Sequence, residues 1–139
     1  MSTRSYIAKK QPDDTFNAVY CHFDGYPEGV GQTLVDSFTD ESKVDKLLEL
    51  GSLSYLGSDI KSPNDLKNPN PDKNVTMAYH RDRGEDLKIN EFPDLESMLE
   101  FFSDSWGDYL YLYDEDNKWL VKNTENDFFM EVTEVLDND

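Results

Sequence analysis

Two strand-turn-strand patterns constrain the fold of this chain more than any other feature. Residues 4–10 and 15–22 are short runs rich in Tyr, Ile, Phe and Val, and the polar residues 11–14 between them favour a turn. The pattern recurs over residues 109–122, with a polar turn at 114–117. Each pattern predicts a hairpin, and two hairpins in one chain predict a mainly antiparallel sheet.

Three further segments place apolar residues at helical spacing. They are residues 27–38, 39–50 and 94–106. Asp40 suits the N-cap of the second segment, and Asp94, which follows a proline, suits the N-cap of the third. Together these patterns predict an α+β fold with a mainly antiparallel sheet and about three helices packed on one face.

The remaining segments give weaker signals. Residues 75–81 predict another strand, whereas residues 128–136 fit either a last strand or a short helix, and their alternation favours the strand. Residues 57–74 contain several prolines and many Asn and Asp residues, which predicts a mobile loop inside a domain. The length of 139 residues fits a single α+β domain over residues 1–139.

The single cysteine rules out an internal disulfide framework and suits a reducing compartment. The N-terminus has no apolar segment typical of a signal peptide, and no run is long enough to span a bilayer. We therefore expect a protein of the cytoplasm that neither spans nor binds a membrane.

The charge is strongly acidic and unevenly distributed. Thirty acidic and 13 basic residues give a net charge of −17, of which −5 comes from residues 1–93 and −12 from residues 94–139. Such a charge repels nucleic acid and anionic membranes and steers the protein toward basic surfaces. Arg81 and Arg83 are flanked by acidic residues, so they do not indicate a nucleic-acid site. The alternative is that acidity serves only solubility.

A row of carboxylates gives this charge a candidate location. In the predicted helix an acidic residue recurs every fourth position, which places the carboxylates about 6 Å apart along the axis. Together with the acidic turn of the second predicted hairpin at residues 114–117, the row predicts a surface that a basic groove of a host protein accepts in place of phosphates. The alternative is an ordinary solvated helix face. The candidate partner-binding residues are Glu96, Glu100, Asp104, Asp108, Asp114, Glu115 and Asp116.

Two His-x-Asp segments form an alternative ligand site. Residues two apart on a strand share a side, so His22 with Asp24 and His80 with Asp82 would meet if neighbouring strands extended that far. Two imidazoles and two carboxylates suit a divalent metal or acid–base chemistry. The other interpretation is that both pairs only close strand ends and turns. We expect no cofactor, and a metal is left undetermined.

Cys21 and the nearby glycines have structural explanations. Adjacent strand residues face opposite ways, so Cys21 cannot form a thiol–imidazole pair with His22 and is expected to be buried. Gly25, Gly29 and Gly31 do not have the spacing of a nucleotide-binding loop, which favours turn and close-packing roles.

Two segments and two flanking features carry a resemblance to a known family. The segments are Tyr20-Cys21-His22-Phe23-Asp24-Gly25-Tyr26-Pro27-Glu28-Gly29-Val30-Gly31 and Tyr79-His80-Arg81-Asp82-Arg83-Gly84-Glu85-Asp86. The flanking features are Thr3-Arg4-Ser5 with Ile7, and Trp106 before Tyr109-Leu110-Tyr111-Leu112. On these residues the chain resembles an uncharacterised family of small proteins from tailed phages, prophages and some bacteria, although Phe23 stands where Trp is more usual.

The resemblance implies a phage accessory protein that acts in a bacterial cytoplasm, and it implies no catalytic residues. The favoured hypothesis is an interaction protein that inhibits a host nucleic-acid-handling or defence complex, of the anti-CRISPR or anti-restriction class, with DNA mimicry as one form. The alternative is a small enzyme, or a ligand-binding or metal-binding module, around the two His-x-Asp segments. Of these, the non-enzymatic hypothesis fits the acidic sequence better.

Overall fold

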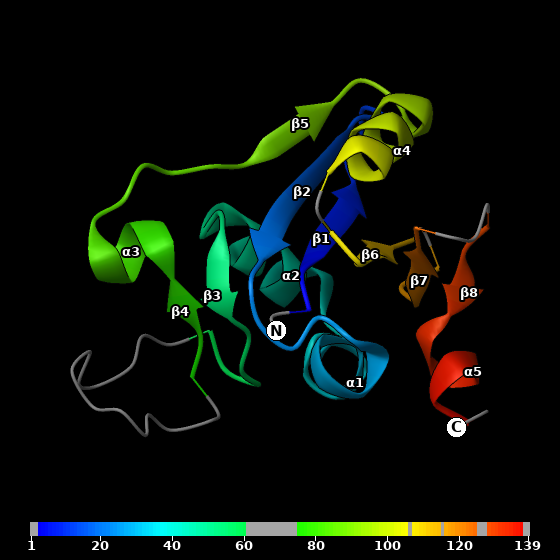
Figure 1. Cartoon of the computed structure of the whole chain (residues 1–139), viewed down its shortest axis with the longest axis horizontal. Helices are drawn as coiled ribbons and strands as arrows, with labels where there is room; N and C mark the ends of the chain where they lie inside the picture. The colour runs from blue at the N-terminus through cyan, green and yellow to red at the C-terminus, as the bar shows by residue number, and fades with distance from the viewer. Residues whose placement is uncertain (1–2, 61–74, 106, 115, 125–127, 138–139) are drawn as a thin grey trace.

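An eight-stranded sheet forms the centre of the protein (Figure 1). The computed structural model describes residues 3–60, 75–105, 107–114, 116–124 and 128–137. The predicted mobile loop at 57–74 therefore lies outside the described residues from position 61 onward. The start of that segment is fixed, because the buried backbone amide of Gly57 donates to Thr76 Oγ1 at 3.1 Å.

The strand order of the sheet is β4-β3-β2-β1-β6-β7-β8, and β5 pairs with β2 beside this path. Most neighbours are antiparallel, whereas the pairs β1–β6 and β2–β3 are parallel. The chain is thus an α+β protein with a mainly antiparallel sheet, as its patterns predict. The strands are β1 (Ser5–Lys10), β2 (Phe16–Cys21), β3 (Leu53–Tyr55), β4 (Met77–Ala78), β5 (Asn90–Phe92), β6 (Tyr109–Tyr113), β7 (Trp119–Asn123) and β8 (Met130–Glu131).

Both predicted hairpins are confirmed. In the first, β1 and β2 pair along their whole length, and in the second β6 pairs in the same way with β7. Asp14 and Asn117 have positive φ angles of 69° and 60° in the two turns. Asp and Asn tolerate this left-handed conformation better than other residues with a Cβ, which explains their place there.

The parallel pairing of β1 with β6 joins the two hairpins. Ser5 lies opposite Tyr109, and Lys9 lies opposite Tyr113. A hairpin pattern reports only local pairing, so the sequence does not reveal this long-range contact. The consequence is that β1 and β6 occupy the middle of the sheet, where helices cover both faces.

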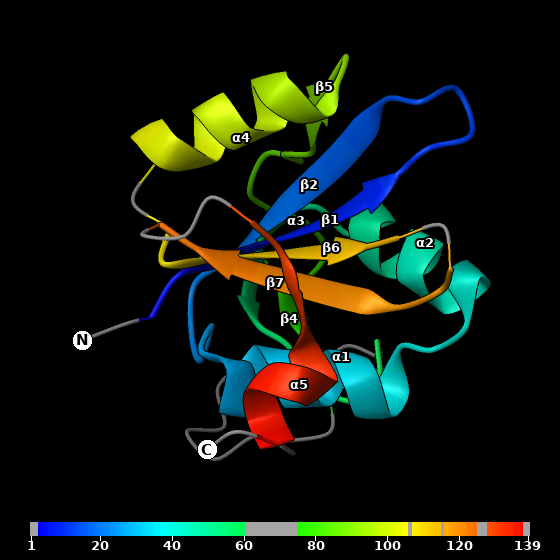
Figure 2. The ribbon, with the colours of Figure 1, turned by 90° about the vertical axis from the view of Figure 1, so that its right-hand side faces the viewer.

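The helices lie on both faces of the sheet (Figure 2), with α4 on one side and α1, α2 and α5 on the other. The helices predicted at 27–38, 39–50 and 94–106 all form within those ranges, but the third does not share the face of the other two. Within the described ranges, no helix has the length and apolar composition needed to cross a bilayer. The helices are a π-helical turn, η1 (Pro27–Gly31), followed by α1 (Gln32–Ser37), α2 (Glu41–Glu49), α3 (Tyr79–Arg83), α4 (Leu95–Asp104) and α5 (Val132–Asp137).

Strand alternation divides the core into two layers. Phe16 and Ala18 face α4, whereas Val19 and Cys21 face the layer of α1 and α2. The layer under α4 is completed by Ala8, Met98, Phe102, Leu110 and Leu112. The larger layer includes Ile7, Val30, Leu34, Phe38, Val44, Leu47, Tyr111, Tyr113, Trp119, Val121 and Val132. Because both faces are covered, the central strands carry apolar side chains on both sides.

The strand predicted at 75–81 is wrong over most of its length. Only Met77–Ala78 form β4, and the chain turns at Tyr79 into α3, which ends at Gly84 with a positive φ of 70°. Strands β3 and β5 are three residues each and give no pattern long enough to read. In residues 128–136 both alternatives occur in succession, because β8 leads directly into α5.

Candidate functional site

Helix α4 carries the central part of the predicted acidic surface. Its N-cap is Asp94, as predicted, whose Oδ1 accepts a hydrogen bond from the backbone amide of Ser97 at 2.8 Å. This bond stabilises the ionised carboxylate and lowers the pKa of Asp94 below its usual value. Met98 and Phe102 are buried against the sheet, so the opposite side of α4 is directed to solvent.

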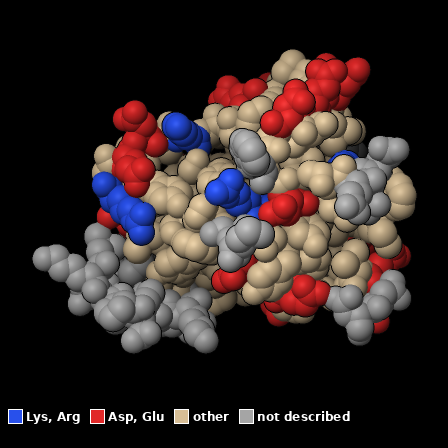
Figure 3. Space-filling model, viewed as in Figure 1, with Lys and Arg blue, Asp and Glu red and all other residues tan. Residues whose placement is uncertain are grey.

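Glu96, Glu100 and Asp104 lie exposed on α4. One helical repeat of four residues separates each from the next, about 6 Å along the axis. Figure 3 shows acidic atoms gathered over this part of the molecule. Among the described residues, none of the three carboxylates lies in an ion pair. The row therefore directs an uncompensated negative field outward.

The other predicted acidic residues have structural tasks as well. Asp108 is exposed, and its Oδ2 accepts from the backbone amide of Arg4 at 3.0 Å. Asp114 Oδ1 accepts from the amides of Asp116 and Lys118 at 2.9 and 3.0 Å, which shapes the β6–β7 turn. Asp116 is exposed in that turn. Glu115 lies outside the described residues.

These residues do not form one continuous patch. The β6–β7 turn lies at the far end of β6 from α4, beside the β1–β2 turn and α2 (Figure 2). Asp114 there lines a hollow of about 260 Å³ together with Lys10, Asp14 and Glu41. The sequence places all seven residues on one surface, whereas the fold separates the row on α4 from the group at the turn.

The structure does not assemble the predicted His-x-Asp site. β2 ends before His22, and Asp24 has a positive φ of 58°, so the two residues do not continue one strand. His80 and Asp82 lie in α3, where residues two apart are related by a rotation of about 200° and so lie on nearly opposite sides of the helix. β3 also separates β2 from β4. Among the described residues, no three His, Cys, Asp or Glu side chains are placed to hold a metal ion.

Each imidazole instead has a local hydrogen bond. His22 Nδ1 lies 2.6 Å from the hydroxyl of Tyr20. His80 Nδ1 lies 2.7 Å from the carbonyl oxygen of Glu85 and donates to it, which ties the two sides of the α3 turn together. These contacts fit the structural interpretation of the two segments.

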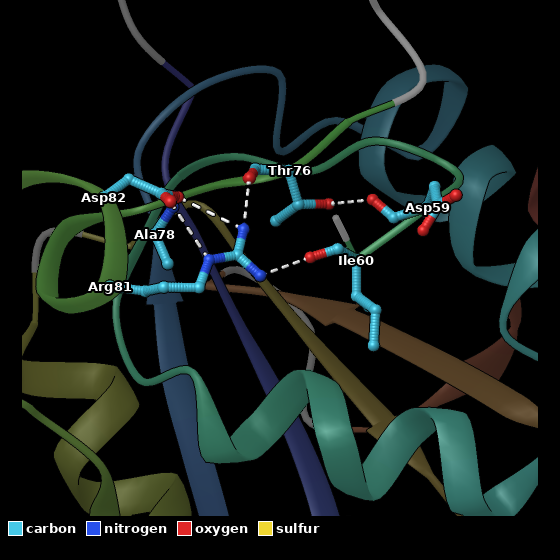
Figure 4. Close-up of polar contacts among 6 residues, drawn as sticks. All are labelled: Asp59, Ile60, Thr76, Ala78, Arg81 and Asp82. Atoms are coloured by element: carbon cyan, nitrogen blue, oxygen red, sulfur yellow. Dashed lines mark hydrogen bonds and ion pairs between the residues drawn. The ribbon is translucent and has the colours of Figure 1, made fainter. Parts of the chain in front are cut away.

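Asp82 is buried and forms a polar cluster with the more exposed Arg81 (Figure 4). Its carboxylate accepts from the amide of Ala78 at 2.8 Å and from Arg81 Nε at 3.0 Å. The Arg81 guanidinium also donates to the carbonyl oxygens of Thr76 and Ile60. The cluster fixes α3 to the segments on either side of residues 61–74, which gives Asp82 a structural role.

Cys21 is buried, as predicted, and burial raises the pKa of its thiol to about 12. The thiol stays protonated at neutral pH and is a poor nucleophile. Its Sγ donates a weak hydrogen bond to the carbonyl oxygen of Phe23 at 3.7 Å. Among the glycines, a Cβ on Gly29 would lie 2.3 Å from the carbonyl oxygen of Asp24, which agrees with a close-packing role.

A ligand site around the two segments predicts a concave pocket that joins them, and a hollow of about 900 Å³ does join them, although through other residues than those predicted. Tyr20 comes from the first segment, whereas Tyr79 and residues 84–86 come from the second. None of the four His-x-Asp residues lines it. The only trace of this hollow in the two segments is that each begins with a tyrosine that lines it, Tyr20 in the first and Tyr79 in the second.

Comparisons with known proteins add no identity. No family model matches the chain, and neither the curated proteins nor the solved structures contain a match.

Proposed function

We propose that this protein is an acidic phage-type accessory protein that binds a basic surface of a host protein. Through that contact it inhibits a nucleic-acid-handling or defence complex of the anti-CRISPR or anti-restriction class. The observation that carries the proposal is the exposed carboxylate row on α4, which forms no ion pair with the described part of the chain, in a protein of net charge −17. The resemblance to phage and prophage proteins supplies the biological setting.

The physical basis is electrostatic complementarity. A host surface that binds phosphates presents Lys and Arg side chains, and regularly spaced carboxylates can replace phosphates there. DNA mimicry is one form of this contact. The same charge opposes direct binding to nucleic acid or to anionic membranes. The attraction acts over about 8–10 Å at physiological salt and therefore speeds encounter with a basic partner.

Helix α4 is suited to present such a row because it is held rigidly. It is capped by Asp94, and Met98 and Phe102 fix it to the sheet. A preorganised helix loses little backbone entropy when it binds, so more of the interaction energy appears as affinity.

The first experiment identifies the partner. A pull-down from infected host cells supplies candidates, and each is titrated with the protein at about 50 mM and about 200 mM salt. We expect binding that weakens steeply with salt, and inhibition that saturates at a fixed ratio of the two proteins. Binding that does not respond to salt would contradict the electrostatic proposal, and inhibition at far lower ratios would indicate an enzyme.

The second experiment locates the surface. The triple variant E96K/E100K/D104K should abolish inhibition, because it reverses the row while leaving the buried side of α4 unchanged. The matched control E49K/E134K/D137K makes the same charge change on exposed residues of α2 and α5, across the sheet from α4. If both variants weaken binding equally, net charge alone acts and α4 is not the binding face.

A further inference from the structure

Aromatic rings form a continuous wall in the 900 Å³ hollow described above. The Tyr6 ring contacts Phe101 edge-on at a centroid distance of 5.4 Å and lies 5.6 Å from the Tyr20 ring. Tyr79 contributes from α3. Figure 1 shows the chain from α3 to β5 arching away from the sheet, and residues of this arch complete the lining. Planar side chains of this kind stack on planar ligands.

Two basic side chains line the same hollow. Arg4 directly precedes β1, and Lys88 comes from the arch before β5. Neither lies in an ion pair with any described residue, in a chain with 30 acidic and only 13 basic residues. Figure 3 shows basic atoms on the surface between α3 and α4. Because no ion pair among the described residues holds either side chain, both can pair with a bound anion.

The tyrosine hydroxyls of the hollow have partners of their own, because the Tyr20 hydroxyl lies 2.6 Å from His22 Nδ1 and Tyr6 forms a hydrogen bond with Ser105. Burial raises the pKa values of both tyrosines, so neither adds a negative charge to the hollow. Ser52, Asn90 and Ser105 supply further polar atoms. Glu85 and Asp86 also line the hollow, and they are exposed, as Lys88 is, so water screens these three charges alike. Arg4 is half-buried, and its charge is the least screened of the four.

We propose that this hollow binds a small aromatic anion, a planar ring that carries a carboxylate or a phosphate. The ring packs against the tyrosines and Phe101, and the anionic group pairs with Arg4 and Lys88. The volume lies in the range of small-molecule sites, and an apolar wall with a few convergent polar groups is their usual construction. This inference does not depend on the acidic row of α4.

Ligand-observed NMR and calorimetry with five probes test the proposal. Adenosine monophosphate and indole-3-acetate represent the two sources of an aromatic anion. Adenosine supplies a ring without the charge, and inorganic phosphate and propionate supply a charge without the ring. We expect at least one aromatic anion to bind with a Kd of about 1 mM or tighter. The three other probes should bind at least about tenfold more weakly, a difference of about 1.4 kcal/mol.

Charge-removing variants assign the binding to the hollow. R4Q and K88Q should each weaken the aromatic anion about tenfold, whereas K46Q, at an exposed position on α2, should leave its affinity unchanged. Lys88 is exposed, so K88Q remains informative if R4Q fails to fold. The inference is overturned if neither aromatic anion binds in this range, if adenosine binds equally well, or if K46Q matches the effect of K88Q.

Discussion

Replacing Arg81 with methionine should lower the free energy of unfolding by about 2–3 kcal/mol. The guanidinium forms a pair with Asp82, whose side chain is only 2% exposed, and donates to Thr76 O at 2.8 Å and to Ile60 O. Removing one partner of a fully buried ion pair costs about 3–5 kcal/mol, because the other charge remains without compensation. Here the Arg81 side chain is 30% exposed, so water reaches part of the site and the cost falls.

Urea unfolding of four proteins measures this effect and assigns it to the pair. The wild type, R81M, D82N and the double variant form a thermodynamic cycle. We expect the loss in the double variant to be smaller than the sum of the single losses by about 1–2 kcal/mol. The stability that the double variant still loses is assigned to the carbonyl oxygens of Ile60 and Thr76, which no longer accept hydrogen bonds from Arg81.

Arg83 provides the matched control. It is exposed two residues away, and its guanidinium lies over the Tyr79 ring at 5.3 Å. R83M should change the unfolding free energy by no more than about 0.5 kcal/mol. If R81M falls within the same limit, the cluster contributes no stability and the reasoning about Asp82 is refuted.

Three further predictions concern the core. Cys21 should react with a thiol reagent only at the rate of unfolding, because its thiol is buried with a pKa of about 12; rapid labelling of the native protein would contradict this. Tyr111→Phe should cost about 1–3 kcal/mol in urea unfolding, because the Tyr111 hydroxyl donates to the buried carbonyl oxygen of Gly25 at 2.6 Å; no loss would show that the bond is dispensable. Burial lowers the pKa of Lys9, but hydrogen bonds and charges from two carboxylates on α2 outweigh this effect and raise the pKa above its ordinary 10.5. The stabilisation that the charged Lys9 gives to the folded state is therefore complete below pH 10.5 and is lost as the pH rises through the folded pKa. Ionisation of buried tyrosines also destabilises the folded protein over this pH range. The test is therefore the difference in unfolding free energy between wild type and Lys9→Met, which should shrink above pH 10.5.

Patterns that depend on near neighbours could be read from the sequence. The hairpins, the caps of α2 and α4 and the exposed row on α4 follow from turn residues and from apolar spacing within about a dozen positions. Gly84 is a sequence signal that the strand expected at 75–81 leaves unused, because glycine commonly ends helices. It comes only after Tyr79 and His80, which also fit a strand.

Relations between distant residues could not be read in this way. The face on which α4 packs depends on the pairing of β1 with β6, and nothing near residue 95 records that pairing. The 900 Å³ hollow gathers Arg4, Tyr20, Lys88 and Phe101 from four parts of the chain. Asp82 shows the converse case, because a carboxylate two residues from a histidine resembles a ligand until its burial and its bond to the Ala78 amide are known.

The parallel contact between β1 and β6 has a consequence for synthesis on the ribosome. β1 emerges first, but one of its two hydrogen-bonding edges belongs to residues 109–113, which leave the exit tunnel much later. The helices α1, α2 and α4 that cover the two faces precede β6 in the chain, but the edge of β1 that pairs with β6 stays bare until then. A bare strand edge promotes association between nascent chains. The topology also raises the contact order, so the native sheet closes late and slowly compared with a meander of the same strands.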